Sequence, residues 1–208
     1  MIQNLIWDLD GTLFDTYPSI VEAFRQAIQA HGQAADPARV ESLSRVGLAY
    51  CWQQLAKDFG IDGQALEDEF SALYAAIPKL AQPPFPGVHE VCESIVLRGG
   101  TNSIATHRRR GSTHELLSIH GLARLFSVIV TADDGLPKKP DPAAFLQILD
   151  RLSLDPAATA AIGDREIDVI AGKAAGLSTC LFRGDARLTQ ADFVFDDYAD
   201  LLSHLEAS

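Results

Sequence analysis

Cysteine is scarce in this chain of 208 residues. The three cysteines, Cys51, Cys92 and Cys180, lie far apart and include no Cys-x-x-Cys pair. A small, odd and scattered set of this kind provides neither a disulfide framework nor the ligand spacing of a structural zinc site. We therefore expect reduced thiols that pack in the core of a cytoplasmic protein.

Positive charge is also scarce, because 17 lysines and arginines face 28 aspartates and glutamates, for a net charge of −11. Surfaces that bind nucleic acid are normally basic, so we expect no nucleic-acid partner. No apolar run approaches the ~18 residues of a membrane-spanning helix, so we expect no membrane partner. The first apolar run begins within the first few residues, so we expect no signal peptide. In so acidic a protein, an anionic substrate would need a local positive centre such as a metal ion, a lysine or an arginine.

The most informative pattern lies at residues 3–16. An apolar run at residues 5–7 predicts a buried strand, and two carboxylates, Asp8 and Asp10, follow it. Residues two apart in a strand face the same side, and Gly11 permits a sharp turn directly afterwards. Two carboxylates repel each other by ~4 kcal/mol at about 4 Å with an effective dielectric constant near 20. We therefore expect a cation or a shared proton to relieve this pair.

The rest of the chain divides into two regions of different periodicity. Residues 17–82 show helical spacing of apolar side chains and no convincing strand, and a proline-rich break follows at 83–87. From residue 88 onward strands and helices alternate, which predicts a parallel sheet with helices on both faces. We expect an α/β, Rossmann-like domain of residues 1–16 and 83–208. A small all-helical domain of residues 17–82 is inserted after its first strand.

Three further groups of polar residues fall at or near the ends of predicted strands. Thr106 ends the strand at 102–106, Lys138 and Lys139 lie in the loop after the next strand, and Asp164 and Asp168 follow the strand that begins at 159. Each group alone is explained as well by a helix cap or a solvated loop charge. Ligands of open α/β sheets bind outside the carboxyl ends of the strands, so we expect these groups to meet the two N-terminal aspartates there.

The residues D-L-D-G-T at positions 8–12, directly after an apolar strand, resemble the first motif of the haloacid dehalogenase-like hydrolase superfamily. In that family the first aspartate is a nucleophile and the second is a general acid and base, which implies those roles for Asp8 and Asp10. Members that displace halide lack the second acid, because halide leaves without a proton. The presence of Asp10 therefore favours phosphate ester chemistry.

The other three motifs of the superfamily are matched in order. Thr106 resembles the second motif and would hydrogen-bond the transferring phosphoryl group. A lysine before proline resembles the third, which implies that Lys139 stabilises negative charge, with Lys138 as the alternative. Asp164 and Asp168 resemble the fourth motif, which holds Mg²⁺.

Asp8, the main-chain carbonyl of Asp10 and Asp164 would supply the hard oxygen ligands that Mg²⁺ prefers. Asp168, one helical turn after Asp164, would hold a metal-bound water or a neighbouring ligand. The helical insertion resembles a cap that closes over small substrates. Arg45 and Gly47 match the cap's substrate loop in phosphoglycolate phosphatase and β-phosphoglucomutase relatives. His107 stands where the family usually has asparagine, so it either binds substrate or begins a solvated helix.

The resemblance implies a Mg²⁺-dependent phosphatase that hydrolyses a small phosphorylated metabolite such as phosphoglycolate, through an aspartyl-phosphate. One alternative is a phosphomutase that uses the same residues and passes the phosphoryl group to a sugar. The other is a non-catalytic phospho-ligand-binding or regulatory protein. We expect a monomer or a homodimer.

Overall fold

The computed structural model describes residues 1–207, and the chain divides into two compact units. One unit contains Met1–Phe14 and the chain from Pro84 onward, and the other is Asp15–Pro83. The expected boundaries, after residues 16 and 82, differ from these by two residues and by one residue.

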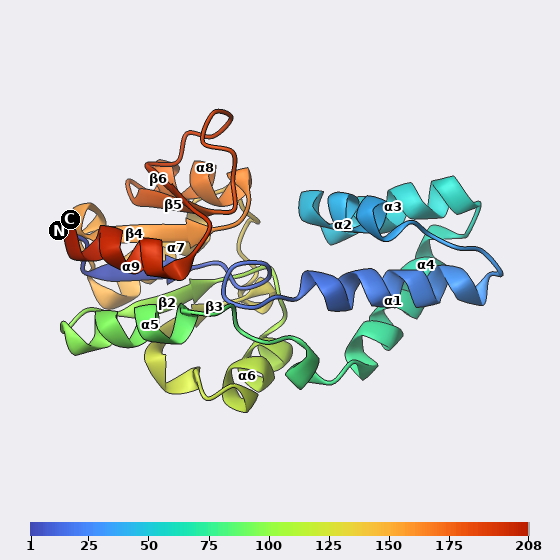
Figure 1. Ribbon diagram of the computed structural model, residues 1–208, viewed down its shortest axis with the longest axis horizontal. Coiled ribbons are helices and arrows are strands. Elements are labelled where there is room, and N and C mark those ends of the chain that lie inside the picture. The colour runs from blue at the N-terminus through green and yellow to red at the C-terminus, as the bar shows by residue number, and fades with distance from the viewer. Residues whose placement is uncertain (208) are drawn as a thin grey trace. The chain divides into compact units, whose positions relative to one another are not determined.

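The first unit contains a six-stranded sheet in which all neighbouring strands are parallel, in the order β3-β2-β1-β4-β5-β6 (Figure 1). The first strand along the chain is therefore central, and its two neighbours, β2 and β4, bring distant parts of the sequence beside it. The predicted α/β parallel sheet is confirmed. The strands are β1 Asn4–Trp7, β2 Asn102–Ala105, β3 Phe126–Val130, β4 Thr159–Gly163, β5 Ser178–Phe182 and β6 Phe193–Phe195.

Helices cover both faces of this sheet, because successive side chains of each strand point to opposite sides. In β1, Leu5 and Trp7 join one apolar cluster with α5 and α9, whereas Ile6 joins another with α7 and α8. All three side chains are fully buried, and each such burial stabilises the fold by about 1.5–3 kcal/mol. The helices of this unit are α5 Val88–Leu97, α6 Arg110–Ile119, α7 Ala143–Leu152, α8 Glu166–Ala174 and α9 Tyr198–Ala207, with short 3₁₀ turns η2 Ala123–Leu125, η3 Ala132–Asp134 and η4 Pro156–Ala158.

The second unit is built of helices with a core of its own. Phe24 and Phe70 stack in this core with ring centroids 4.1 Å apart. Asp36 and Asp62 cap two of the helices by accepting hydrogen bonds from main-chain N–H groups of the first turn. The helices are α1 Tyr17–Ala30, α2 Pro37–Val46, α3 Leu48–Phe59 and α4 Gly63–Ala76, followed by the 3₁₀ turn η1 Lys79–Ala81.

The three cysteines are buried and free of disulfides, as expected for packing groups. Burial raises the pKa of the Cys51 thiol to about 11, which keeps it protonated and a poor nucleophile. Within residues 1–207, every helix is too short or too polar to cross a membrane.

Candidate active site

The register of two neighbouring strands brings Asp8 and Asp164 together. Trp7 of β1 lies opposite Ile162 of β4, and the Asp8 N–H donates to the Ile162 carbonyl at 2.8 Å. Asp8 follows the end of β1, and Asp164 follows the end of β4. Both carboxylates therefore emerge at the carboxyl edge of the sheet, as the sequence predicts.

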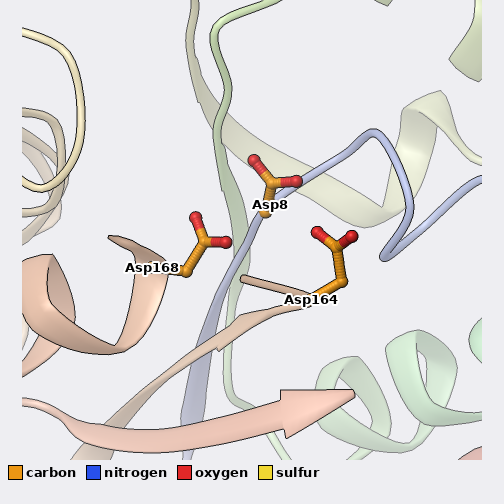
Figure 2. Close-up of side chains that lie close together, drawn as sticks. All are labelled: Asp8, Asp164 and Asp168. Atoms are coloured by element: carbon orange, nitrogen blue, oxygen red, sulfur yellow. The ribbon is translucent and has the colours of Figure 1, made fainter. Parts of the chain in front are cut away.

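Asp168 joins these two residues from the first turn of α8. Carboxylate oxygens of Asp8, Asp164 and Asp168 all lie within 4.8 Å of one another (Figure 2). The Oδ2 atom of Asp168 accepts a hydrogen bond from the main-chain N–H of Arg165 at 3.2 Å, and this bond anchors the carboxylate to the start of the helix. The Arg165 side chain lies beside Asp164, with Nε 3.9 Å from Oδ1.

Gly163 makes room for this arrangement. A Cβ atom added at Gly163 would lie 2.3 Å from Cβ of Asp168 and 2.4 Å from its Cγ, far inside van der Waals contact. Any side chain at this position would displace Asp168. Gly163 is a site-shaping residue to which sequence reasoning gave no role, although it stands directly before Asp164.

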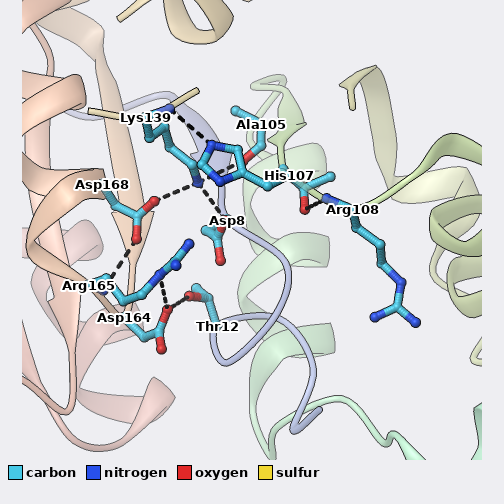
Figure 3. Close-up of polar contacts among 10 residues, drawn as sticks. Asp8, Thr12, Ala105, His107, Arg108, Lys139, Asp164, Arg165 and Asp168 are labelled. Atoms are coloured by element: carbon cyan, nitrogen blue, oxygen red, sulfur yellow. Dashed lines mark hydrogen bonds and ion pairs between the residues drawn. The ribbon is translucent and has the colours of Figure 1, made fainter. Parts of the chain in front are cut away.

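The structure brings Lys139, and not Lys138, to the carboxylates. The Lys139 amine lies 2.5 Å from Oδ1 of both Asp8 and Asp168, and it donates to the Ala105 carbonyl at 3.0 Å (Figure 3). Its side chain is 1% exposed, whereas Lys138 faces solvent. Burial alone would lower the pKa of Lys139, but the charges of Asp168 and Asp8 outweigh it and raise that pKa. Lys139 therefore carries its charge in the site.

One oxygen of Asp8 has no partner among the described residues. Asp8 is 2% exposed, its Oδ1 is bonded to Lys139, and its buried Oδ2 accepts no hydrogen bond. An unsatisfied buried polar atom costs about 1–3 kcal/mol, and more when charged. A cation beside Asp8 and Asp164 would remove that cost, and a donor set made of carboxylate oxygens suits a hard ion such as Mg²⁺. The residues present therefore fit the predicted metal.

Asp10 has a partner that sequence reasoning missed. Arg108 Nη1 lies 2.6 Å from Asp10 Oδ1, and Arg108 Nε donates to Ser112 Oγ at 2.9 Å. The main-chain N–H of Arg108 donates to Thr106 Oγ1 at 3.1 Å. Thr106 is buried at the end of β2, where its own N–H donates to the Val130 carbonyl. The sequence indicated such a pair only by the run of three arginines at 108–110, which follows a predicted strand in an otherwise acidic chain.

His107 does not begin a solvated helix, because α6 begins only at Arg110 and the histidine ring is partly buried. Its Nε2 accepts a hydrogen bond from the main-chain N–H of Lys139 at 2.9 Å. Burial and the nearby Lys139 charge lower the pKa of His107 to about 3, so the ring is neutral near pH 7. A contact of His107 with substrate stays a prediction.

Arg45 and Gly47 belong to the helical unit. Arg45 pairs with Glu41 at 2.9 Å in the last turn of α2, and its guanidinium carbon lies 4.1 Å from the centroid of the Tyr17 ring. Gly47 is the single residue between α2 and α3, at φ 156°. Their contact with substrate stays a prediction.

A comparison of the sequence with models of known protein families identifies the family of this chain. A family model described as haloacid dehalogenase-like hydrolase matches residues 5–182. The chain belongs to this family of hydrolases. The resemblance noted in the sequence is thereby confirmed, and so is the prediction that the chain is an enzyme.

Individual relatives match nearly the whole chain. A phosphoglycolate phosphatase from Pectobacterium atrosepticum is 29% identical, over 97% of this chain and 91% of its own. A crystal structure provisionally named phosphoglycolate phosphatase, from Haemophilus somnus, superposes with a TM-score of 0.85 at 22% identity, covering 98% of this chain and 97% of that one. One provisionally named β-phosphoglucomutase, from Thermotoga maritima, gives 0.83 at 22% identity, with 99% of both chains covered. At such identities these two structures show a common fold.

Proposed function

We propose that this hydrolase is a Mg²⁺-dependent phosphatase that cleaves a small organic phosphate monoester of the phosphoglycolate type. The observation that carries the proposal is the surroundings of Asp8, whose carboxylate has one oxygen on Lys139 and the other buried without a partner. The curated relative named phosphoglycolate phosphatase supports the substrate class. The substrate is a soluble metabolite, and we infer that the enzyme acts in the cytoplasm.

Asp8, Asp164 and Asp168 would hold the Mg²⁺ ion, together with the main-chain carbonyl of Asp10. When bound, the ion supplies positive charge against the phosphoryl oxygens. The charge balance around the ion supports this need, because the three aspartates that would hold it outnumber the two cationic side chains that lie beside them, those of Lys139 and Arg165. Without further positive charge, a phosphate dianion would meet net repulsion.

The protein groups then divide the work of a two-step transfer. A carboxylate oxygen of Asp8 attacks phosphorus, the bond from phosphorus to the leaving oxygen breaks, and Asp10 delivers a proton to that oxygen. In the second step a water molecule attacks the phosphorus of the aspartyl-phosphate, and Asp10 accepts a proton from it. Inorganic phosphate leaves, and Asp8 is regenerated. Lys139 and Thr106 stabilise the charge of the transferring group.

We assign the role of a cap to the helical unit, residues 17–82 by sequence, with Arg45 and Gly47 on its substrate loop. A cap of this kind excludes water and selects among phosphate esters by contacts away from the phosphoryl group.

A panel of phosphate monoesters with and without Mg²⁺ tests the function. Wild-type protein should release inorganic phosphate with Mg²⁺, lose that activity in EDTA and regain it when Mg²⁺ is restored. Ca²⁺ should support little turnover because it accepts looser and higher coordination. The variant Asp8→Asn should release none, whereas the matched variant Asp150→Asn, on the exposed side of α7, should behave as wild type. Full activity in EDTA, or phosphate release by Asp8→Asn, would contradict the proposal.

Product analysis distinguishes the phosphomutase alternative, which shares all of these residues. A mutase would require a bisphosphate and would yield an isomer of the substrate. The proposed phosphatase yields free phosphate and the dephosphorylated alcohol in equal amounts.

A further inference from the structure

The side chain and the main chain of Lys139 are both hydrogen-bonded to residues 105–107. Its side-chain amine donates to the carbonyl of Ala105 at 3.0 Å, and its main-chain N–H donates to the ring of His107 at 2.9 Å. Ala105 and His107 flank Thr106 at the end of β2, so this strand end supports both the charged group and the backbone of the lysine (Figure 3).

The direction of the main-chain bond defines the state of the imidazole. The Lys139 N–H can only donate, so the Nε2 atom of His107 must present a lone pair. The ring is then neutral, with its proton on Nδ1. The environment maintains this state, because burial, Lys139 and Arg165 lower the pKa of His107 more than Asp168 raises it.

The loop that carries Lys139, residues 136–140, has few other main-chain hydrogen-bond donors that could fix its position. Between η3 and α7, residues 136–140 read Leu-Pro-Lys-Lys-Pro, and two prolines leave only three main-chain N–H groups in the segment. A lysine side chain has a flexible four-carbon stem, so the position of its amine depends on where its backbone is anchored. A displacement of about 1 Å at a catalytic group can cost 10²-fold in rate.

We propose that His107 is a positioning residue that holds Lys139 between Asp8 and Asp168 through its main-chain hydrogen bond. This role rests on the proposed phosphatase, in which the Lys139 charge faces the transferring phosphoryl group. It differs from both alternatives that the sequence left open, a substrate contact and the start of a solvated helix, because His107 then acts through the lysine and independently of the leaving group.

Two substitutions of His107 distinguish the effect of its hydrogen-bond acceptor from the effect of its volume. His107→Gln keeps an acceptor atom near the position of Nε2, whereas His107→Leu fills similar space without one. With a simple aryl phosphate and Mg²⁺, the leucine variant should lose roughly 10²-fold in kcat with little change in KM, and the glutamine variant should recover most of that loss. His114→Leu, on the exposed side of α6, is the matched control and should leave kcat unchanged.

Three kinetic results would overturn the proposal. They are a leucine variant with wild-type kcat, a glutamine variant as impaired as the leucine variant, and an effect confined to KM. The last result would show that His107 binds substrate.

A measurement on the wild-type protein needs neither turnover nor a folded variant. The ¹⁵N NMR shifts of the His107 ring should show an unprotonated Nε2, and the Lys139 amide should exchange slowly with solvent. A protonated Nε2 or a rapidly exchanging Lys139 amide overturns the positioning role whatever the activity. The expected spectrum in a protein that cleaves no phosphate ester would instead refute the phosphatase and leave the hydrogen bond established.

Discussion

Arg108 forms an ion pair with Asp10, and the pair links the second sequence motif to the first across 98 residues. The Arg108 side chain is 6% exposed and that of Asp10 is 29% exposed. The pair therefore lies at the inner rim of the site, where Arg108 is also tied to Ser112. The ion pair holds the carboxylate of Asp10, to which we assign the acid and base role, against Arg108. The importance of Arg108 was not evident from the sequence.

We expect Arg108 and Asp10 to be energetically coupled. Arg108→Met leaves the carboxylate without its charged partner, so it should lower the free energy of unfolding by about 1–3 kcal/mol. In Asp10→Asn the same arginine substitution should cost about 1 kcal/mol less, because the charge pair is already lost. Urea unfolding of the two single variants and the double variant measures this coupling. Strict additivity would show that the ion pair contributes nothing to stability.

The role of Asp10 should appear in its dependence on the leaving group. An alkyl phosphate leaves as a strongly basic alkoxide that needs a proton, whereas an aryl phosphate leaves as a stabilised anion. General acid help is worth roughly 10²- to 10⁴-fold, so Asp10→Asn should slow the first step much more for alkyl than for aryl substrates. Single-turnover measurements with both substrate types test this. Equal losses for the two leaving groups would contradict the role of Asp10 as general acid. A burst of product from Asp8→Asn would contradict the role of Asp8 as nucleophile.

Gly163→Ala should damage the site by steric displacement. The added methyl group would meet Asp168 at 2.3 Å, so both the carboxylate cluster and its contact with Lys139 must move. We expect loss of at least about 10²-fold in kcat, together with destabilisation of about 1–3 kcal/mol from overpacking. Gly111→Ala is a matched control in α6, where an added methyl meets no atom within 4 Å. That variant should be active and about 0.5–1 kcal/mol more stable, since alanine favours a helix. A fully active Gly163→Ala enzyme would refute the steric argument.

Acid should destabilise the protein partly through His107. The pKa of this ring falls from an ordinary value near 6.5 to about 3 in the folded protein, so its contribution to stability is fully present above pH 6.5 and is lost as the pH falls towards 3. At pH 4.5, two pH units below the ordinary pKa, the loss should be about 3 kcal/mol. His107→Leu should therefore lose less stability than wild type between pH 7 and pH 4.5, as measured by urea unfolding. Parallel pH profiles for the two proteins would contradict a depressed pKa.

The helical unit should select the substrate through Arg45. If Arg45 contacts the part of the substrate away from the phosphoryl group, Arg45→Ala should raise KM for the physiological ester and barely change KM for a small aryl phosphate. Steady-state kinetics with both substrates measures the difference. Arg25→Ala is a comparable control, because Arg25 likewise forms an exposed ion pair within one helix of this unit. Equal effects of Arg45→Ala on both substrates would remove it from the specificity site.

Much of this protein could be predicted from local patterns in the sequence. The buried run of β1 and the alternation beyond residue 88 predict a parallel sheet, because apolar periodicity reflects burial directly. Asp8, Asp10, Thr106 and Asp164 could be selected for a related reason, since chemistry at the carboxyl ends of strands needs residues at the ends of apolar runs. Lys139 is preferred to Lys138 through the resemblance to the third motif of the family, in which a lysine precedes proline.

Only the tertiary structure decided how these residues use one another. The Arg108–Asp10 pair, the contact of the Lys139 amine with Asp8 and the bond from the Lys139 main chain to His107 all join segments more than 30 residues apart. Strand pairing brings such segments together, and the order of strands in a sheet cannot be read from any one stretch of sequence. Periodicity predicts which residues are buried, whereas the partners of a charged group depend on which distant backbone lies beside it.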